Sequence, residues 1–375
     1  MTARRIRELR FERSGKLGWH ERDAPALQEP TDAIVRPFLA GRCDGDTVPI
    51  HRPLSRAMQA GLALGLIDPV VRGICGAVPF RGPFPIGHEC VAEITALGPD
   101  VSGLQVGQRV IVPWAVSCGS CPPCRDGLTS KCATASAGQP LAAYGFGAAS
   151  GPWGGMVTDE FRVPFAEHML VAVPPAIPAA RLAAASDNLA DAWRCVVPAL
   201  TGRDNASVLV LGGGAKSIGL YAAGLAATFG GIVDYLDDDA GRREIAESFG
   251  ARTRPRRTRY EVVIEATSRA SGLRRAVRAA APGGVCTGVG YYLASGTRLP
   301  LMHMYATDVT LRLGVSHARA LLPDLLEFLD GTRFPAERVT TLTADWDTAP
   351  RAYTARTTKV VLARPPLHPE SAGVP

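Results

Sequence analysis

The sequence predicts an α/β protein of two domains, one rich in strands and one built on a doubly wound parallel sheet. The chain has 375 residues, which is enough for two separate cores. Residues 207–239 show a buried strand, a run of glycines, a helix and a second strand in succession. Residues 4–40 alternate apolar and polar side chains, as half-buried strands do.

Composition and charge indicate a soluble globular protein and argue against membrane and nucleic-acid-binding proteins. Apolar residues make up 46% and charged residues 20%, which is typical of a soluble globular protein. Because no run of about 18 apolar residues occurs and the first residues lack the apolar core of a signal peptide, we expect no membrane span and a cytoplasmic location. Net charge is +6, but the arginine-rich stretch 252–259 has no interleaved aromatic residues. We therefore expect a solvated basic surface and no nucleic-acid partner.

A thiol and an imidazole in the strand-rich part predict a metal site. Cys43 follows one predicted strand, and His88 begins another. Cysteine sulfur and histidine nitrogen are ordinary zinc ligands, and a catalytic zinc keeps three protein ligands and one open position. Asp46 is placed to accept a hydrogen bond from the second nitrogen of His88. Glu89 is either a transient ligand or a structural acid near the metal.

Four of the nine cysteines are clustered, and this is the most specific signal in the chain. In a cytoplasmic protein such clustering indicates a metal rather than disulfides. Thiolates at the spacing C-x2-C-x2-C-x7-C can close around one zinc with no open position, while an iron–sulfur cluster is the alternative. The four cysteines are Cys118, Cys121, Cys124 and Cys132. The isolated cysteines (Cys75, Cys90, Cys195 and Cys286) are expected to be core thiols.

A mostly helical segment is predicted over residues 181–200, directly before the glycine-rich unit. Asp187 lies on it among small apolar residues. Such an acid is either a charge near a helix N-terminus or a third metal ligand.

The unit 207–239 predicts a dinucleotide site. Glycines let the backbone approach a phosphate, and the helix N-terminus offers free N–H groups. Asp237 ends the second strand, where an acid can accept hydrogen bonds from a ribose diol. In the usual G-x-G-x-x-G spacing, the third glycine is replaced here by Ser217. The next glycine, Gly219, comes two residues late and is expected to let the helix pack on the sheet. The predicted contacts of the turn are Gly212, Gly214, Ser217, Ile218 and Gly219. An ordinary glycine turn without a nucleotide is the alternative.

Beyond Asp237 the strand–helix alternation continues, as in a parallel sheet. Helices are predicted over 242–248, 271–281 and 320–329, and strands over 260–266, 284–290 and from residue 359 on.

Taken in order, these motifs resemble the zinc-dependent medium-chain alcohol dehydrogenase family. The likeness covers about residues 5–364 and implies a GroES-like catalytic domain of 1–188 with 318–375 and a Rossmann domain of 189–317. It implies a catalytic zinc held by Cys43, His88 and Asp187, and a structural zinc in the four-cysteine lobe. Asp237 matches the acid that selects NAD in the family, although Arg242 nearby leaves NADP as an alternative cofactor. Lys359 matches a basic residue that touches the pyrophosphate.

The resemblance also implies an activity. We expect a zinc-dependent hydride transfer between NAD(P) and a secondary alcohol, which is polyol- or sugar-like or a biosynthetic intermediate, with a carbonyl as product. Two zinc ions per chain, NAD in preference to NADP, a small-molecule substrate, and a homodimer or homotetramer complete the expectation.

Two departures from the family pattern keep alternatives open. Gly45 stands where the family has a hydroxyl that relays the alcohol proton, so Asp44, Glu89, the substrate or water takes that role, or turnover is unusual. Residues 47–85 hold an insertion that is expected to shape the substrate pocket or an oligomer contact. The alternatives are a biosynthetic carbonyl reductase or epimerase-like relative that uses the cofactor transiently, and a non-catalytic, zinc-stabilised nucleotide-binding protein.

Overall fold

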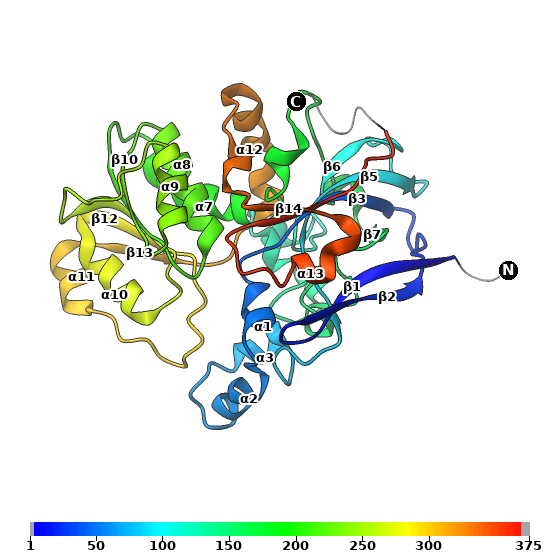
Figure 1. Ribbon diagram of the computed structural model, residues 1–375, viewed down its shortest axis with the longest axis horizontal. Coiled ribbons are helices and arrows are strands. Elements are labelled where there is room, and N and C mark those ends of the chain that lie inside the picture. Colours follow the sequence, from blue (N-terminus) through cyan, green and yellow to red (C-terminus); the bar gives the residue numbers. More distant parts are fainter. Residues whose placement is uncertain (1–3, 369–375) are drawn as a thin grey trace. The chain divides into compact units, whose positions relative to one another are not determined.

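The computed structural model describes residues 4–368, and it divides the chain into two compact units (Figure 1). The first unit is Met1–Asp187 with His317–Pro375, and the second is Asn188–Ser316. Each boundary lies one residue before the expected one. The first unit is rich in antiparallel strands and the second holds a parallel sheet with helices, so the predicted α/β fold class is confirmed.

The first unit holds a seven-stranded and a three-stranded sheet. The larger sheet has the order β14-β15-β3-β5-β6-β8, with β7 paired to β3, and the smaller has the order β2-β1-β4. The strands are β1 (Arg5–Arg13), β2 (Lys16–Asp23), β3 (Ala33–Gly41), β4 (Phe84–Pro85), β5 (Glu89–Leu97), β6 (Arg109–Ile111), β7 (Phe161–Val163), β8 (Val171–Ala172), β14 (Leu342–Asp345) and β15 (Val360–Ala363). The helices are α1 (Thr47–His51), α2 (Ser55–Ala63), α3 (Val70–Cys75), α4 (Pro122–Arg125), α5 (Ala133–Ser136), α6 (Ala166–Met169), α12 (Ala318–Thr332) and α13 (Ala349–Ala352).

The register of β3 against β5 decides where the first unit places its reactive side chains. The two strands are antiparallel, and Gly41 lies opposite Glu89. The end of β3 therefore meets the start of β5. Cys43, two residues after Gly41, and His88, one residue before Glu89, emerge at the same end of the sheet.

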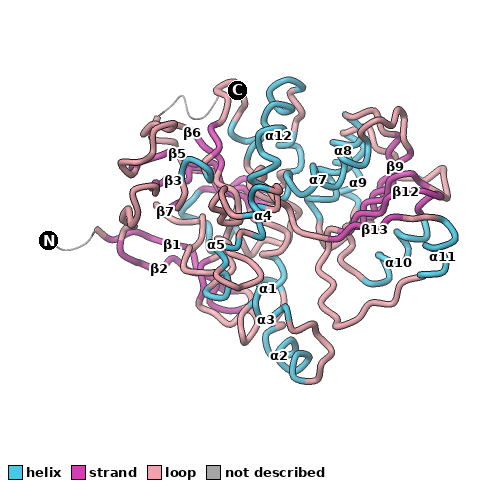
Figure 2. The backbone as a smooth tube through the Cα atoms, turned by 180° about the vertical axis from the view of Figure 1, so that it is seen from behind, coloured by secondary structure: helices cyan, strands magenta, loops and turns pink. Residues whose placement is uncertain are grey.

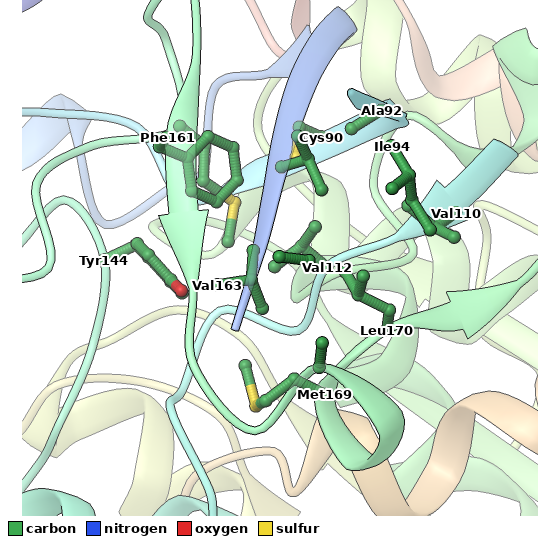
Figure 3. Close-up of a cluster of buried hydrophobic side chains, with 14 of the residues drawn as sticks. Cys90, Ala92, Ile94, Val110, Val112, Tyr144, Phe161, Val163, Met169 and Leu170 are labelled. Atoms are coloured by element: carbon green, nitrogen blue, oxygen red, sulfur yellow. The ribbon is translucent and has the colours of Figure 1, made fainter. Parts of the chain in front are cut away.

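A core of alternating side chains holds this sheet in place. Cys90, Ala92 and Ile94 of β5 project to one side, because successive side chains of a strand point to opposite faces. They pack with side chains from β7 and from the loops around it, as Figure 3 shows. Cys90 is therefore a core thiol, as expected.

The insertion between Cys43 and His88 is helical. Helices α1, α2 and α3 occupy most of residues 47–75. Leu64, Leu66 and Val70, at the connection between α2 and α3, are exposed.

The second unit is a five-stranded parallel sheet of order β10-β9-β11-β12-β13. Helices α8 and α9 lie on one side of this sheet and α10 and α11 on the other (Figure 2). The strands are β9 (Ser207–Leu211), β10 (Ile232–Leu236), β11 (Tyr260–Glu265), β12 (Ala280–Gly288) and β13 (Thr310–Leu313). The helices are α7 (Asn188–Leu200), α8 (Lys216–Thr228), α9 (Ala240–Ser248), α10 (Ala270–Ala279) and α11 (Leu301–Thr307).

The segment 181–200 is mostly helical, as predicted, but its first seven residues lie outside the α-helix. A short 3₁₀ turn covers Ala179–Leu182, and α7 begins only at Asn188. The cause lies in Ser186, whose hydroxyl bonds the backbone N–H and C=O of Cys90, both at 3.1 Å. Its carbonyl accepts from the Trp114 N–H at 3.2 Å. These bonds hold the segment before α7 against β5 and replace the helical hydrogen bonds.

The C-terminal part of the first unit is tied to β3 by Tyr353, which is fully buried. Its hydroxyl donates to the Gly41 carbonyl at 3.0 Å. We expect Tyr353→Phe to lower the free energy of unfolding by about 1–3 kcal/mol, because the buried carbonyl loses a partner. Urea unfolding followed by circular dichroism measures this. Tyr305→Phe, at a side chain that is 80% exposed, should change it by less than about 0.5 kcal/mol. Equal stability of the two variants would contradict the role of this bond.

Candidate metal centres and cofactor-binding turn

Cys43, His88 and Asp187 come together from three separate segments of the first unit. Cys43 Sγ lies 3.1 Å from Asp187 Oδ2. His88 Nε2 lies 3.4 Å from the same oxygen. One ligand atom from each residue lies within 4.8 Å of the others. A tetrahedral zinc with bonds of 2.0–2.3 Å separates its ligand atoms by about 3.5 Å, so the donor set and its spacing fit zinc.

Asp46 holds the imidazole of His88 from the opposite side. Its Oδ1 lies 3.6 Å from His88 Nδ1, and its Oδ2 accepts from the Cys43 N–H at 3.2 Å. Burial lowers the pKa of His88, but Asp46 and then Asp187 outweigh it and raise this pKa to about 9. The Asp46 carboxylate thus faces Nδ1 at an ion-pair distance that is too long for the expected hydrogen bond, while Nε2 faces Asp187.

Burial raises the pKa of the Cys43 thiol well above its ordinary value, and the carboxylates of Asp187 and Asp46 raise it further. A thiol in this setting remains protonated unless a cation joins it. A divalent metal supplies that positive charge, and this is a second reason why these three side chains suit a metal.

Glu89 is close to this cluster but is held by another residue. Its carboxylate pairs with the ammonium of Lys359, and both side chains are fully buried. The Lys359 ammonium also donates to the Arg42 carbonyl at 3.1 Å. The structure thus shows Glu89 as a partner of Lys359. A direct contact of Lys359 with a pyrophosphate, implied by the resemblance, stays a prediction.

Gly45 leaves the expected relay position without a side chain. Its N–H donates to Cys43 Sγ at 3.3 Å. The nearby hydroxyl of Thr47 donates to the Asp44 carbonyl at 2.6 Å. Asp44 itself is buried beside Cys43.

Two aromatic rings beside the cluster were missed in the sequence. Phe146 stacks on the His88 ring with centroids 4.7 Å apart. Trp114 lies 6.5 Å from His88 and 5.8 Å from Phe146, measured between ring centroids. Only folding reveals them, because Trp114 follows β6 and Phe146 lies in a glycine-rich loop. They form an apolar wall beside the candidate metal site.

Arg42, directly before Cys43, was also missed. It is almost fully buried and donates to three backbone carbonyls. These belong to Tyr353 at 2.6 Å, Ala355 at 2.7 Å and Thr357 at 3.1 Å. Arg42 thus anchors the Cys43 loop to the C-terminal segment.

The four clustered cysteines converge in a lobe around α4. Their sulfur atoms all lie within 4.8 Å of one another, and no disulfide joins them. Cys121 Sγ and Cys132 Sγ are 3.9 Å apart, and the N–H groups of Cys118 and Ala135 point at Cys132 Sγ at 3.3 Å. Burial raises the pKa of the Cys118 thiol, but hydrogen bonds from Thr134 and Ser120 lower it by more, to about 5. The set fits a closed metal site, which leaves no open position for chemistry.

The glycine turn of the second unit joins β9 to α8. Gly212 lies beside the end of β10, and its N–H donates to the Leu236 carbonyl at 2.8 Å. A Cβ on Gly219 would lie 3.3 Å from the Cβ of Ala266, so this glycine lets α8 approach the sheet, as expected. Ser217, in place of the third glycine, is buried and donates to Asn188 at 2.9 Å. Ile218 is buried next to it.

At the end of β10, the expected ribose acid is already paired. The Asp237 carboxylate accepts two hydrogen bonds from Arg242, at 2.7 Å from Nε and 2.6 Å from Nη2. The neighbouring Asp238 is exposed. A Cβ on Gly212 would lie 2.4 Å from Asp237 Oδ2, so the carboxylate touches the glycine turn. Within the residues that the structure describes, no helix has both the length and the apolar character that crossing a bilayer requires.

Comparison with known proteins agrees with this geometry. Residues 29–175 match the alcohol dehydrogenase GroES-like domain. A probable zinc-binding alcohol dehydrogenase of Mycobacterium tuberculosis is 29% identical, over 98% of this chain and 90% of its own. The structure of an alcohol dehydrogenase from Thermus sp. ATN1 superposes with a TM-score of 0.78 at 29% identity, covering 95% of this chain and 99% of that one. The chain is thus similar to zinc-binding alcohol dehydrogenases along nearly its whole length, and residues 29–175 match their GroES-like domain.

The likeness in fold covers both units. An alcohol dehydrogenase of Escherichia coli shares it at 22% identity, with a TM-score of 0.73 over 96% of this chain and 99% of that one. The likenesses to the Mycobacterium tuberculosis and Thermus proteins support a zinc-binding oxidoreductase of the alcohol dehydrogenase type.

The Asp237–Arg242 pair makes stability depend on pH. Burial raises the pKa of Asp237, but the hydrogen bonds from Arg242 win and lower it below the ordinary value of 3.8. The pair therefore stabilises the fold above about pH 4 and this contribution is lost as pH falls below it. We expect Asp237→Asn to cost about 1–3 kcal/mol at pH 7, and the gap to wild type to narrow as pH falls below about 4. Urea unfolding at each pH, with Asp238→Asn as the exposed control, tests this. A gap that is independent of pH would contradict it.

Proposed function

We propose that this enzyme transfers a hydride between a secondary alcohol and a nicotinamide dinucleotide, with a carbonyl compound as product. The observation that carries the proposal is the mixed cluster of Cys43, His88 and Asp187, with one ligand atom from each within 4.8 Å. A zinc ion held there would supply a Lewis acid that lowers the pKa of the substrate hydroxyl. The chain's own part is to hold the three donors in place and to leave a fourth position open.

The residues around the cluster have separate tasks in this proposal. Asp46 orients His88 and keeps Nε2 turned toward Cys43 and Asp187. Trp114 and Phe146 exclude water from one side and offer ring faces to the carbon skeleton of the substrate. The acid ligand Asp187 and the resemblance together favour a polyol- or sugar-like secondary alcohol, or a biosynthetic intermediate of that kind.

For the cofactor, we propose that the turn at Gly212, Gly214, Ser217 and Ile218 holds the pyrophosphate against the N-terminus of α8. Gly219 supports the proposal because it lets that helix sit close to the strands. The Escherichia coli relative of the same fold was solved with NADH. We further propose a cytoplasmic homodimer or homotetramer, a state that analytical ultracentrifugation measures directly.

The missing relay hydroxyl at Gly45 favours one further function. An epimerase-like relative also needs the metal and the nicotinamide, but the alcohol proton can stay in the site because it is returned in the same turnover. A biosynthetic carbonyl reductase runs the dehydrogenase reaction in reverse and needs the same proton path. Product analysis with a deuterated secondary alcohol separates these activities, because an epimerase returns the label to its product and a dehydrogenase leaves it on the cofactor.

The two clusters predict two zinc ions per chain. We expect Cys43→Ser and Cys121→Ser each to lose one equivalent, because each removes one sulfur ligand from a different site. Elemental analysis of gel-filtered protein measures this. Cys75→Ser is the matched control, since Cys75 belongs to neither cluster and should keep both ions. One zinc in the wild type, unaffected by Cys43→Ser, would leave the non-catalytic nucleotide-binding protein as the better account. Iron in the four-cysteine lobe would indicate a cluster there instead.

Catalysis should depend on the first cluster alone. We expect Cys43→Ala and His88→Ala to lower kcat/KM for secondary alcohols by about 10³-fold or more while NADH binding persists, because the activating metal is lost and the nucleotide turn is intact. Steady-state absorbance assays with butan-2-ol and sorbitol, beside NADH fluorescence titration, test this. Turnover that survives in either variant, or in wild-type protein stripped of zinc, would refute the metal-assisted reaction.

A further inference from the structure

The Asp237 carboxylate carries a full set of hydrogen bonds before any nucleotide is added. Arg242 donates to both of its oxygens, at 2.6 Å to Oδ1 and 2.7 Å to Oδ2. Oδ2 also accepts from the Tyr235 hydroxyl, and Oδ1 from the Asp239 N–H, both at 2.9 Å. The side chain is 1% exposed. Each oxygen thus already has two donors.

This pairing removes the physical basis of an NAD preference. An acid at the end of the second strand favours NAD because its lone pairs accept from the ribose diol and its charge repels a 2′-phosphate. Here the lone pairs of Asp237 are occupied, and the Arg242 guanidinium balances its charge at hydrogen-bonding distance. The third guanidinium nitrogen, Nη1, makes no bond to Asp237, and arginine nitrogens are strong donors to phosphate.

Arg242 is held where it can serve either cofactor. It lies in the first turn of α9, and its N–H donates to Asp239, the residue that caps this helix. Its Nη1 lies 3.6 Å from Asp239 Oδ2. A second guanidinium, that of Arg243, donates to the Asp237 carbonyl at 2.8 Å. Two arginines therefore meet the acid at this strand end.

The pair also lies against the turn that the proposed function assigns to the pyrophosphate. β9 and β10 are paired in parallel, with Leu211 opposite Leu236. Gly212 and Asp237 follow these two residues and are neighbours. Because a Cβ on Gly212 would lie 2.4 Å from Asp237 Oδ2 and 2.6 Å from the Tyr235 oxygen, only glycine fits beside the carboxylate. A ribose attached to a phosphate at this turn has to meet Asp237 and Arg242.

We propose that Arg242 decides the cofactor choice and, by neutralising Asp237, lets this enzyme bind NADPH with an affinity within about tenfold of that for NADH. The inference rests on the proposed nicotinamide-binding function and deepens it. With NADPH, Arg242 Nη1 and Arg243 meet the 2′-phosphate, while Arg242 Nε and Nη2 stay on Asp237 and keep its charge compensated. With NADH, one of the two Arg242–Asp237 hydrogen bonds breaks, and the ribose diol donates to the freed carboxylate oxygen instead. The preference for NAD expected from Asp237 alone is thereby replaced by dual use.

Fluorescence titration of the wild type and of variants with NADH and with NADPH tests the proposal without any turnover. Arg242→Gln should weaken NADPH binding by about 10- to 100-fold, because a charge-assisted contact is lost and Asp237 becomes an unpaired anion. NADH binding should change by less than about threefold or improve. Arg242→Lys, which keeps the charge and loses the fork, should fall between wild type and Arg242→Gln for NADPH.

Arg252→Gln is the matched control. It breaks a comparable pair, in which Arg252 Nε lies 2.6 Å from Oδ1 of Asp234, within β10 and away from the glycine turn. It should leave the ratio of the two affinities unchanged. Thermal unfolding shows whether each variant is folded. If Arg242→Gln does not fold, the Arg242→Lys variant still tests the proposal.

Three outcomes overturn the inference. Wild-type protein that binds NADH more than about 100-fold tighter than NADPH shows that Asp237 repels the phosphate despite its partner. A ratio that Arg242→Gln leaves unchanged shows that Arg242 does not set the choice. A failure of both nucleotides to bind any folded variant refutes the proposed function together with this inference, whereas tight binding of NADH alone refutes only the inference.

Discussion

The pairing of β3 with β5 is the constraint on which the rest of the first unit depends. It places Gly41 opposite Glu89, so that Cys43 and His88 leave the sheet at the same end. A shift of one residue would turn one of the two strands over and separate the sulfur from the imidazole, because side chains alternate between the faces of a sheet. The buried alternation of β5 opposes such a shift, since it would move Cys90, Ala92 and Ile94 out of their core.

Buried charged side chains hold the C-terminal segment against the loop that carries Cys43. Lys359 and Glu89 form an ion pair without solvent, and Arg42 donates to the carbonyls of the segment that precedes Lys359. Unpaired charges at these depths are strongly destabilising. The C-terminal segment is therefore held against the loop that carries Cys43, although more than 300 residues of sequence lie between Arg42 and Tyr353. The same device occurs in the second unit, where Arg242 compensates Asp237.

The insertion after Cys43 adds three helices without disturbing the cluster. The chain leaves the sheet at Cys43, forms α1 to α3, and returns at His88 with the register intact. The conformational cost of closing a loop rises only slowly with its length, so a long excursion between two ligands is tolerated when both ends are fixed by paired strands. The exposed residues Leu64, Leu66 and Val70 mark the outer part of this insertion.

Local pattern alone determined much of this protein. Strand 207–211, strand 232–236 and the helix between them follow from apolar runs and glycines, and the four-cysteine lobe follows from spacing. Tertiary structure decided the remainder, because it depends on partners distant in sequence. Ser186 interrupts a helix by bonding β5, Phe146 and Trp114 meet at His88, and Lys359 is enclosed by Glu89. Asp237 is the clearest example. Its position at the end of a strand could be predicted from the sequence, but its pairing with Arg242 depends on how α9 folds back over that end.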